Sequence, residues 1–232
     1  MHIDVLTLFP EIFPGPLGTS VVGRAAERGL ATVGTVDVRK FASDARGTVD
    51  EKPYGGGPGM LMMVEPLTLA LESVRRPGSV VVMTTPRGDV FDESMARELS
   101  QVPHLILVAG HYEGVDERFL RQSVDREVSL GDYVLSNGNL AAMVIADAVI
   151  RLLPGVLGDD ASSCEGSHSN DLLEYPQYTR PEEFRSQRVP EVLLSGDHGR
   201  IARWRRSEAE RLTRESRPDL WEKYLQRQTK EV

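Results

Sequence analysis

Three short polar stretches hold the side chains with the most chemical potential in this chain. They are Thr85-Pro86-Arg87-Gly88, Gly110-His111-Tyr112-Glu113-Gly114 and Ser136-Asn137-Gly138-Asn139. Each follows a short apolar run typical of a buried strand and precedes a helical pattern. In a parallel sheet such turns meet at one edge, where small ligands bind. The sequence therefore predicts one shared pocket, although strand-to-helix connections also need glycine for turning alone.

The elements that must position these turns alternate between strand and helix. Apolar runs predict strands at residues 3–9, 33–38, 80–84, 105–109 and 133–135, and helical patterns occupy the segment up to 30, 65–74, 91–99, the segment from 115, and 140–153. This alternation is typical of an α/β fold with a mostly parallel sheet and helices on both faces.

The helix at 140–153 and the strand before it organise the chain. Its only charges are Asp147 and Arg151, so most of its surface should be buried, and their spacing also allows a simple ion pair between them. Tyr133, Val134 and Leu135 are expected to be core residues, pocket residues, or both.

A glycine-rich loop follows residue 52, with the sequence Pro53-Tyr54-Gly55-Gly56-Gly57-Pro58-Gly59-Met60. Its glycines permit positive φ angles and close approach of the backbone to a ligand. It lacks the Gly-Lys-Ser/Thr ending of a phosphate-binding loop. A structural turn and a binding loop both remain open.

Composition limits the class of protein. The 232 residues carry a net charge of −8, which argues against a coat of basic residues but allows a local basic patch. One cysteine, Cys164, cannot form an intramolecular disulfide, and no Cys/His cluster has zinc-ligand spacing, so we expect no structural metal and a reducing compartment. Asp4 and Pro10 interrupt the first apolar run, which argues against a signal peptide. No apolar segment is long enough to span a membrane. We expect a soluble cytoplasmic protein.

The composition changes after Gly158. Residues 159–171 contain almost no apolar side chains, which predicts a flexible linker or lid at 159–175 before a small helical domain at 176–232. A helical segment at 199–215 gathers arginines around Trp204. It is either a solvated helix laced with Glu208 and Glu210 or a surface for phosphate contact.

Seven blocks in order resemble one family: LTLFPEIF, TVDEKPYGGGPGM, LILVAGHYEGVDER, LGDYVLSNGNLAAM, RLLPGVLG, YPQYTRP and VLLSGDHGRIARWRR. The whole chain is similar to the bacterial tRNA (guanine-N1)-methyltransferases of the SPOUT class. The resemblance implies S-adenosylmethionine-dependent methylation of N1 of the guanine immediately 3′ of the anticodon. It also implies a trefoil knot that threads the three turns in residues 1–158, and an obligate homodimer with the active site between subunits.

The resemblance also assigns residues. The cofactor pocket would comprise Pro86, Gly110, Leu130, Gly131, Asp132, Tyr133, Val134, Leu135 and Gly138. Arg151 corresponds to an active-site arginine that stabilises negative charge on the guanine. The C-terminal domain would grip tRNA through Arg200 and Arg203, with Arg180 at its hinge. Mg²⁺ would assist, although the sequence shows no dedicated carboxylate cage.

One motif departs from the family pattern. The family places an aspartate general base in a motif resembling Glu-Asp-Ser-Phe, whereas this chain reads Glu165-Gly166-Ser167-His168. Gly166 cannot take a proton, so Glu165 is the first substitute, Asp171 the second and His168 the third. Two alternatives follow: a protein that binds cofactor and tRNA with weak or no catalysis, or a SPOUT methyltransferase acting on another RNA.

Overall fold

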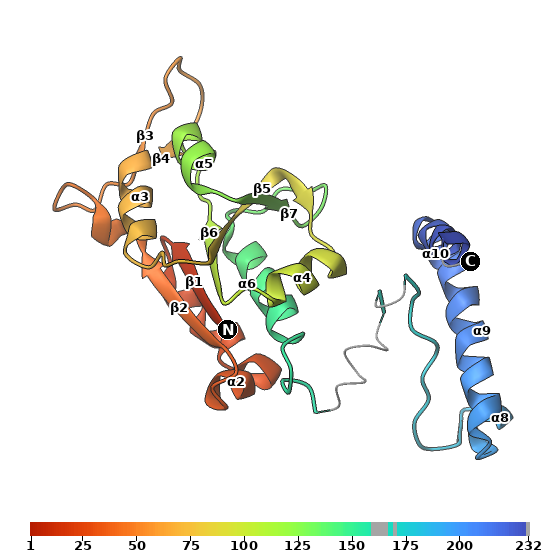
Figure 1. The fold of residues 1–232 in the computed structure, drawn as a ribbon. Helices are drawn as coiled ribbons and strands as arrows, with labels where there is room; N and C mark the ends of the chain where they lie inside the picture. The colour runs from red at the N-terminus through yellow and green to blue at the C-terminus, as the bar shows by residue number, and fades with distance from the viewer. Residues whose placement is uncertain (159–166, 169–170, 231–232) are drawn as a thin grey trace. The chain divides into compact units, whose positions relative to one another are not determined.

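The chain forms two compact units, Met1–Gly158 and Asp159–Val232. The computed structural model describes residues 1–158, 167–168 and 171–230 (Figure 1). Glu165 and Gly166, the positions that decide the identity of the general base, lie outside the described residues.

A five-stranded sheet is the centre of the first unit, with every strand parallel to its neighbours in the order β2-β1-β6-β5-β7. The strands are β1 (His2–Thr7), β2 (Thr32–Asp37), β5 (Ser79–Val90), β6 (His104–Ala109) and β7 (Arg126–Ser129). The predicted parallel sheet is confirmed. A small antiparallel pair, β3 (Asp50–Glu51) and β4 (Leu61–Met62), lies apart from it.

Helices cover both faces of this sheet, as the alternating pattern predicted (Figure 1). They are the 3₁₀ helices η1 (Pro10–Ile12) and η2 (Val38–Phe41), and α1 (Pro14–Leu17), α2 (Ser20–Glu27), α3 (Val64–Glu72), α4 (Glu93–Ser100), α5 (Glu117–Ser123) and α6 (Asn139–Ile150). Alternate residues of a strand point to opposite faces. Leu105 and Leu107 of β6 therefore join an apolar cluster with α2, α4 and α6, while Ile106 and Val108 join a second cluster with α3 and α5.

The predicted strand at 133–135 is wrong. Tyr133, Val134 and Leu135 form no regular element and are 56%, 82% and 36% exposed. The strand at this place in the order is β7, which no apolar run predicts because Val128 is its one apolar residue beside Arg126, Glu127 and Ser129. β7 pairs with β5 alone, and an edge strand tolerates charges that a central strand would not.

The third strand also ends later than predicted. β5 continues to Val90, but its pairing with β7 shifts in register between Thr84 and Asp89. The Thr85-Pro86-Arg87-Gly88 stretch fills that shift, so it interrupts the pairing without ending the strand. Proline within a strand occurs at such irregularities because it has no N–H to donate.

Most of α6 is buried, as its composition predicted, but one stripe is not. Leu140 and Val144 are 58% and 48% exposed, and Asp147 and Arg151 continue the same side of the helix. These positions are spaced three or four residues apart, which places them on one face. We call Leu140, Val144, Asp147 and Arg151 the outer face of α6.

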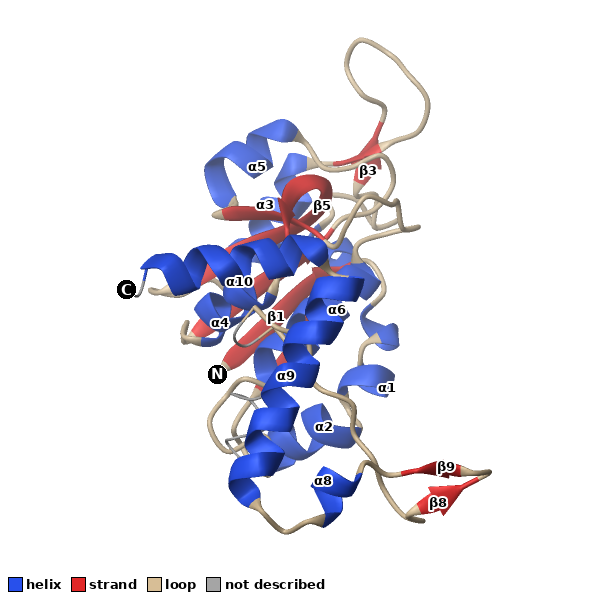
Figure 2. Ribbon diagram, turned by 90° about the vertical axis from the view of Figure 1, so that its right-hand side faces the viewer, coloured by secondary structure: helices blue, strands red, loops and turns tan. Residues whose placement is uncertain are grey.

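The glycine-rich loop connects β3 and β4 and projects from the unit (Figure 2). Gly55, Gly56, Gly57 and Gly59 all have positive φ, as expected from their type, and Tyr54 is fully exposed. A Cβ atom added at Gly55, Gly56 or Gly57 would meet no atom within 4 Å, so the tip of the loop is open.

The described part of the second unit consists of two long helices, one short helix and a short strand pair around a small core. Its elements are β8 (Glu183–Phe184), β9 (Gln187–Arg188), α8 (Glu191–Leu194), α9 (His198–Ser216) and α10 (Pro218–Lys230). The helix predicted at 199–215 is α9, which Asp197 caps by accepting a hydrogen bond from the Arg200 N–H at 2.9 Å. Leu172, Ala209 and Tyr224 form the buried cluster between α9 and α10, which cross each other (Figure 2). In the described ranges, no helix combines the length and the apolar character needed to cross a membrane.

Thr7 fastens the first strand to α6. Its buried Oγ1 donates to Asn139 Oδ1 at 2.8 Å and accepts from the Phe9 N–H at 3.0 Å. This explains why a polar side chain is buried at the end of β1.

Replacing Thr7 by Val should lower the free energy of unfolding by about 1–3 kcal/mol, because a buried acceptor and a buried N–H lose their partner. The matched control is Thr32→Val, on the exposed side of β2, which should change stability by less than about 0.5 kcal/mol. Differential scanning calorimetry of both variants measures the difference, and equal midpoints would contradict this role for Thr7.

Candidate active site

A pocket of about 220 Å³ opens at the carboxyl edge of the sheet. Three segments form its walls: the register shift of β5, the turn after β6, and the segment from β7 to α6. The lining residues are Met83, Thr84, Thr85, Pro86, Gly110, His111, Tyr112, Glu113, Gly114, Val128, Ser129, Leu130, Tyr133, Val134, Leu135, Ser136, Asn137, Gly138 and Ala141. The prediction that these three stretches share one pocket is confirmed, although Thr85–Gly88 interrupts the pairing of β5 and does not end the strand.

The turn before α6 is bonded directly to the ends of the neighbouring strands. The Gly138 N–H donates to the Gly110 carbonyl at 2.7 Å, and Thr84 Oγ1 lies 3.2 Å from the Val108 carbonyl and 3.4 Å from that of Gly138. A Cβ atom on residue 138 would lie 2.7 Å from the Gly110 nitrogen and closer still to Thr84 Oγ1. Only glycine fits here, because the lack of a side chain allows the turn to approach Gly110 and Thr84 closely.

Most of the residues predicted to bind the cofactor line this pocket. Seven of them do so: Pro86, Gly110, Leu130, Tyr133, Val134, Leu135 and Gly138. Gly131 and Asp132 belong to the same segment but are not among the lining residues, and Asp132 is exposed. Gly131 has a φ of +148°, which turns the chain so that the Tyr133 ring lies against it.

Two polar lining residues, Thr84 and Ser129, were not singled out from the sequence. They add hydroxyl groups to the walls, beside Thr85, Ser136 and Asn137 of the predicted turns. The position of Thr84 at the end of an apolar run was the one feature of the sequence that could have predicted a place in the pocket. Residue type alone predicts none, because such side chains are common in any turn.

His111 brings an unpaired polar atom to the pocket. Its Nδ1 is buried and has no hydrogen-bond partner among the described residues. Burial, with the nearby positive charge of Arg39 as a further cause, lowers the pKa of His111, so the imidazole is neutral at physiological pH. The ring lies between Phe9 and Tyr112, with centroids at 5.3 Å and 4.6 Å. Such an atom offers one hydrogen bond to a polar ligand group.

Tyr112 next to it keeps its proton. Burial and a hydrogen bond with Asp50 raise the pKa of this phenol. The positive φ of 58° at Tyr112 tightens the turn after β6. The two rings themselves are therefore uncharged, although Arg39 and Asp50 lie close to them.

Arg151 lies at the far end of α6 from the pocket. It is the residue after Ile150, whereas Gly138 precedes the first turn, so about 18 Å of helix separates the two. Within residues 1–158 its guanidinium forms no ion pair, so the alternative of an ion pair with Asp147 is not observed. Arg151 is exposed.

The other candidate bases belong to the second unit. Asp171 Oδ2 lies 3.5 Å from Arg227 Nη1, and the His168 N–H donates to the Leu172 carbonyl at 2.9 Å. Glu165 lies outside the described residues, so its placement is not tested.

The arginines of α9 fall into three groups. Arg206 and Arg211 pair with glutamates of the same helix, while Arg205 and Arg214 lie over the rings of Tyr175 and Trp221. Among the described residues, Arg200, Arg203 and Arg180 form no ion pair and are exposed. The solvated-helix reading thus fits Arg206 and Arg211, and phosphate contact is open to the others.

The fold and the pocket define a parallel α/β protein whose turns enclose a ligand site at the carboxyl edge of the sheet. A family model described as tRNA (Guanine-1)-methyltransferase TrmD matches residues 1–223. The chain belongs to this family of methyltransferases, and the resemblance found in the sequence is confirmed.

Several relatives that share one name align with most of the chain. A protein of Chloroflexus aggregans named tRNA (guanine-N(1)-)-methyltransferase is 55% identical over 223 residues, which is 95% of this chain and 87% of the relative. Proteins of that name from Geobacter sulfurreducens and Carboxydothermus hydrogenoformans are 54% and 53% identical, covering 96% and 90% of this chain and 92% and 83% of their own.

Replacing Gly138 by Ala should close the pocket and destabilise the first unit, because the new methyl group would meet backbone and hydroxyl atoms. Overpacking of this kind costs about 1–3 kcal/mol. Gly15→Ala is the matched control, because nothing lies within 4 Å of its Cβ position. Calorimetric unfolding measures both, and an unchanged midpoint for Gly138→Ala would contradict the close approach.

Proposed function

We propose that this chain transfers the methyl group of S-adenosylmethionine to N1 of the guanine immediately 3′ of the anticodon in tRNA. The observation that carries the proposal is the pocket formed by three turns in a chain that belongs to a methyltransferase family. The three relatives described above share one name, which favours neither a protein with weak catalysis nor an enzyme for another RNA.

The pocket suits an adenosine-bearing cofactor. Leu130, Val134 and Leu135 offer apolar walls, and the glycines at 110 and 138 bring backbone groups close to the cavity. Such walls hold a flat base, while backbone N–H and C=O groups read its polar edge. The unpaired Nδ1 of His111 supplies a further hydrogen bond without adding charge.

The chain must align two reactants and manage one proton. When bound, the cofactor supplies an electrophilic methyl group on a sulfonium. Holding the guanine N1 in line with it contributes much of the acceleration. A carboxylate takes the N1 proton as the N1–methyl bond forms, and the methyl–sulfur bond breaks to leave a neutral thioether. Arg151 would stabilise the negative charge that the guanine gains.

Glu165 is the proposed base. It precedes Gly166, the position at which the family pattern places its aspartate. Asp171 is a weaker candidate because Arg227 already lies 3.5 Å from its carboxylate. His168 stays third.

A homodimer would explain why Arg151 lies far from the pocket of its own chain. A second copy could bring its Arg151 to that pocket. The outer face of α6 exposes Leu140 and Val144, and the pocket segment exposes Tyr133 and Val134. Apolar side chains gathered in this way are typical of a surface that a partner covers.

The second unit would bind the tRNA through its unpaired arginines. Arg180, Arg200 and Arg203 are exposed cations without a competing carboxylate among the described residues, so phosphate oxygens can pair with them. A tRNA substrate would place the enzyme in the cytoplasm. We also propose that the linker at 159–175 acts as a lid, that the chain forms a trefoil knot through the three turns, and that Mg²⁺ assists the reaction.

Methylation of defined tRNA transcripts tests the function. Single-turnover transfer to a transcript with guanine after the anticodon should proceed, and replacing that guanine by adenine should abolish it. No transfer in a single turnover would favour the binding protein, and undiminished transfer to the adenine transcript would favour another target.

Glu165→Ala should slow transfer by about 10²–10⁴-fold at saturating cofactor, because the N1 proton loses its acceptor. Cofactor binding measured by calorimetry should not change. Glu222→Ala, an exposed glutamate of α10, is the control. Gly166→Asp should raise the rate by restoring the carboxylate at the family position. Near-normal transfer by Glu165→Ala removes Glu165 from the role of base.

Val144→Glu should convert the proposed dimer to monomers, because it buries a charge in the contact. Leu69→Glu is the matched control: it changes a residue 43% exposed on α3, which covers the opposite face of the sheet. Sedimentation velocity measures the mass of each variant. A Val144→Glu protein that sediments like the wild type would contradict a dimer through α6.

A further inference from the structure

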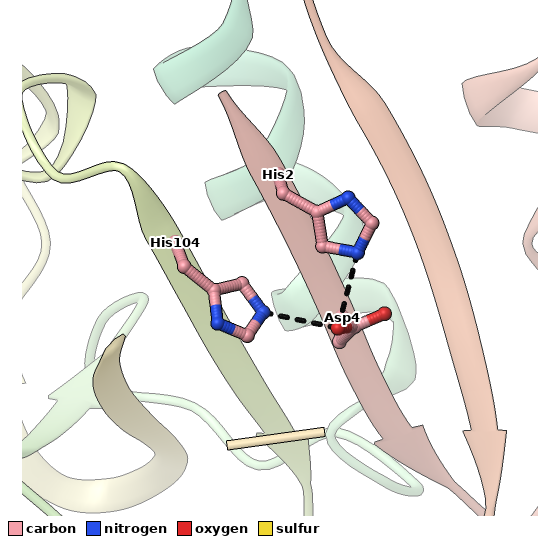
Figure 3. Close-up of side chains that lie close together, drawn as sticks. All are labelled: His2, Asp4 and His104. Carbon is pink, nitrogen blue, oxygen red and sulfur yellow. Dashed lines mark hydrogen bonds and ion pairs between the residues drawn. The ribbon is translucent and has the colours of Figure 1, made fainter. Parts of the chain in front are cut away.

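A second group of chemically active side chains lies at the opposite edge of the sheet, where the parallel strands begin. His2 and Asp4 of β1 and His104 of β6 bring two imidazoles and a carboxylate together (Figure 3). The Nε2 atoms of His2 and His104 lie 3.1 Å and 3.0 Å from the same Asp4 oxygen, Oδ2. The pocket of the first site opens at the other end of these strands.

The register of the sheet produces this group. His2 pairs with His104 across β1 and β6, and Asp4 lies two residues along β1, on the same face. The register partner of Asp4 on β2 is Gly34, whose Cβ position is only 2.5 Å from Asp4 Oδ1. A larger residue at position 34 would displace the carboxylate, so the glycine makes room for it.

The group is largely removed from water. His104 is 2% exposed and Asp4 is 6% exposed, while the His2 side chain is 31% exposed and opens to solvent. Burial, with the positive charge of Arg76 as a further cause, lowers the pKa of His104. The imidazole of His104 is thus buried beside the carboxylate of Asp4, with its Nε2 3.0 Å from Oδ2.

Ser79 orients that imidazole from behind. Its Oγ lies 2.7 Å from His104 Nδ1 and accepts a hydrogen bond from the Arg76 N–H at 3.0 Å. A hydroxyl has two lone pairs and one proton, so Ser79 can accept from Nδ1–H or donate to Nδ1. When it accepts, Nε2 carries a lone pair. This tautomer suits Asp4 only with a cation between the two atoms, because a carboxylate oxygen 3.0 Å away would otherwise repel that lone pair. A hydroxyl on the second ring nitrogen is a partner typical of a histidine that binds a metal.

We propose that His2 Nε2, Asp4 Oδ2 and His104 Nε2 form a binding site for a divalent transition-metal ion, with Zn²⁺ as the best match. Two imidazoles and one carboxylate are ligands that Zn²⁺ accepts at about 2.0–2.2 Å. Ligands of a tetrahedral ion at that distance lie about 3.4 Å apart. The His2 and His104 nitrogens, which are 3.1 Å and 3.0 Å from Oδ2, would therefore move away from it by a few tenths of an ångström when the ion enters. The solvent-open side at His2 leaves room for water as a fourth ligand.

Asp4 also pairs with Arg76, which is its one arginine or lysine partner among the described residues. Its Nη2 lies 3.9 Å from Oδ2, and its side chain is 51% exposed, so it can move into solvent when the ion enters. The metal would replace a weak ion pair with direct coordination. It would link β1 to β6 near Met1, as a structural clip at the start of the chain.

Cobalt binding to chelator-treated, full-length protein without a polyhistidine tag tests the site, because Co²⁺ in a nitrogen and oxygen site gives a visible absorption band. One equivalent should bind, and Zn²⁺ should displace it. Metal-induced increase of the unfolding midpoint provides a readout that does not depend on methyl transfer.

Ser79→Ala removes a hydrogen-bond partner of a ligand and should weaken Co²⁺ and Zn²⁺ binding by roughly 10–100-fold. His2→Gln removes a ligand itself and should weaken the binding of both ions by at least as much. His2 is partly exposed, so this variant should fold. His198→Gln is the control, because His198 is an exposed histidine of α9. Equal affinities of wild type and His2→Gln, or no binding by the wild type, would overturn the proposal.

Discussion

The site depends on one constraint: the turn before α6 is hydrogen-bonded to Thr84 of β5 and to Gly110, directly after β6. The Gly138 N–H bonds to the Gly110 carbonyl, and Thr84 Oγ1 lies between the Val108 and Gly138 carbonyls. These contacts join segments that are distant in sequence, and they leave no room for a side chain at position 138. The pocket is therefore bounded by backbone held in place on three sides, which suits a site that must position a reactive group with little movement.

Helix α6 connects this pocket to the remainder of the first unit. Its first turn contributes Asn139 to Thr7 and Ala141 to the pocket wall, and its buried side packs on the sheet through residues such as Ile145 and Val149. Its outer face remains apolar at Leu140 and Val144 and ends in charge at Arg151. One helix thus supports a pocket at one end and presents a cation at the other.

The two edges of the sheet carry different chemistry for a physical reason. At the carboxyl edge, irregular turns expose backbone groups and small side chains around a cavity. At the amino edge, strands lie in register, so side chains from neighbouring strands gather in rows, as His2, His104 and Ser79 do. A row of side chains suits an ion, whereas a cavity with free backbone groups suits a larger ligand.

The sequence by itself determined the alternation of strands and helices, the burial of most of α6, and the meeting of three turns at one edge. Burial on both faces requires continuous apolar runs, and turns require glycine, so both leave local patterns. The family resemblance already implied that Tyr133, Val134 and Leu135 lie in the pocket, but only the tertiary structure decided that they form no strand, because an apolar run shows only that apolar contact is favourable, not what provides it. The tertiary structure also decided that β7 is a strand despite its charges, and that Asp4 meets His104, a residue 100 positions away. Strand register sets such contacts, and register depends on the packing of the whole sheet rather than on any local stretch.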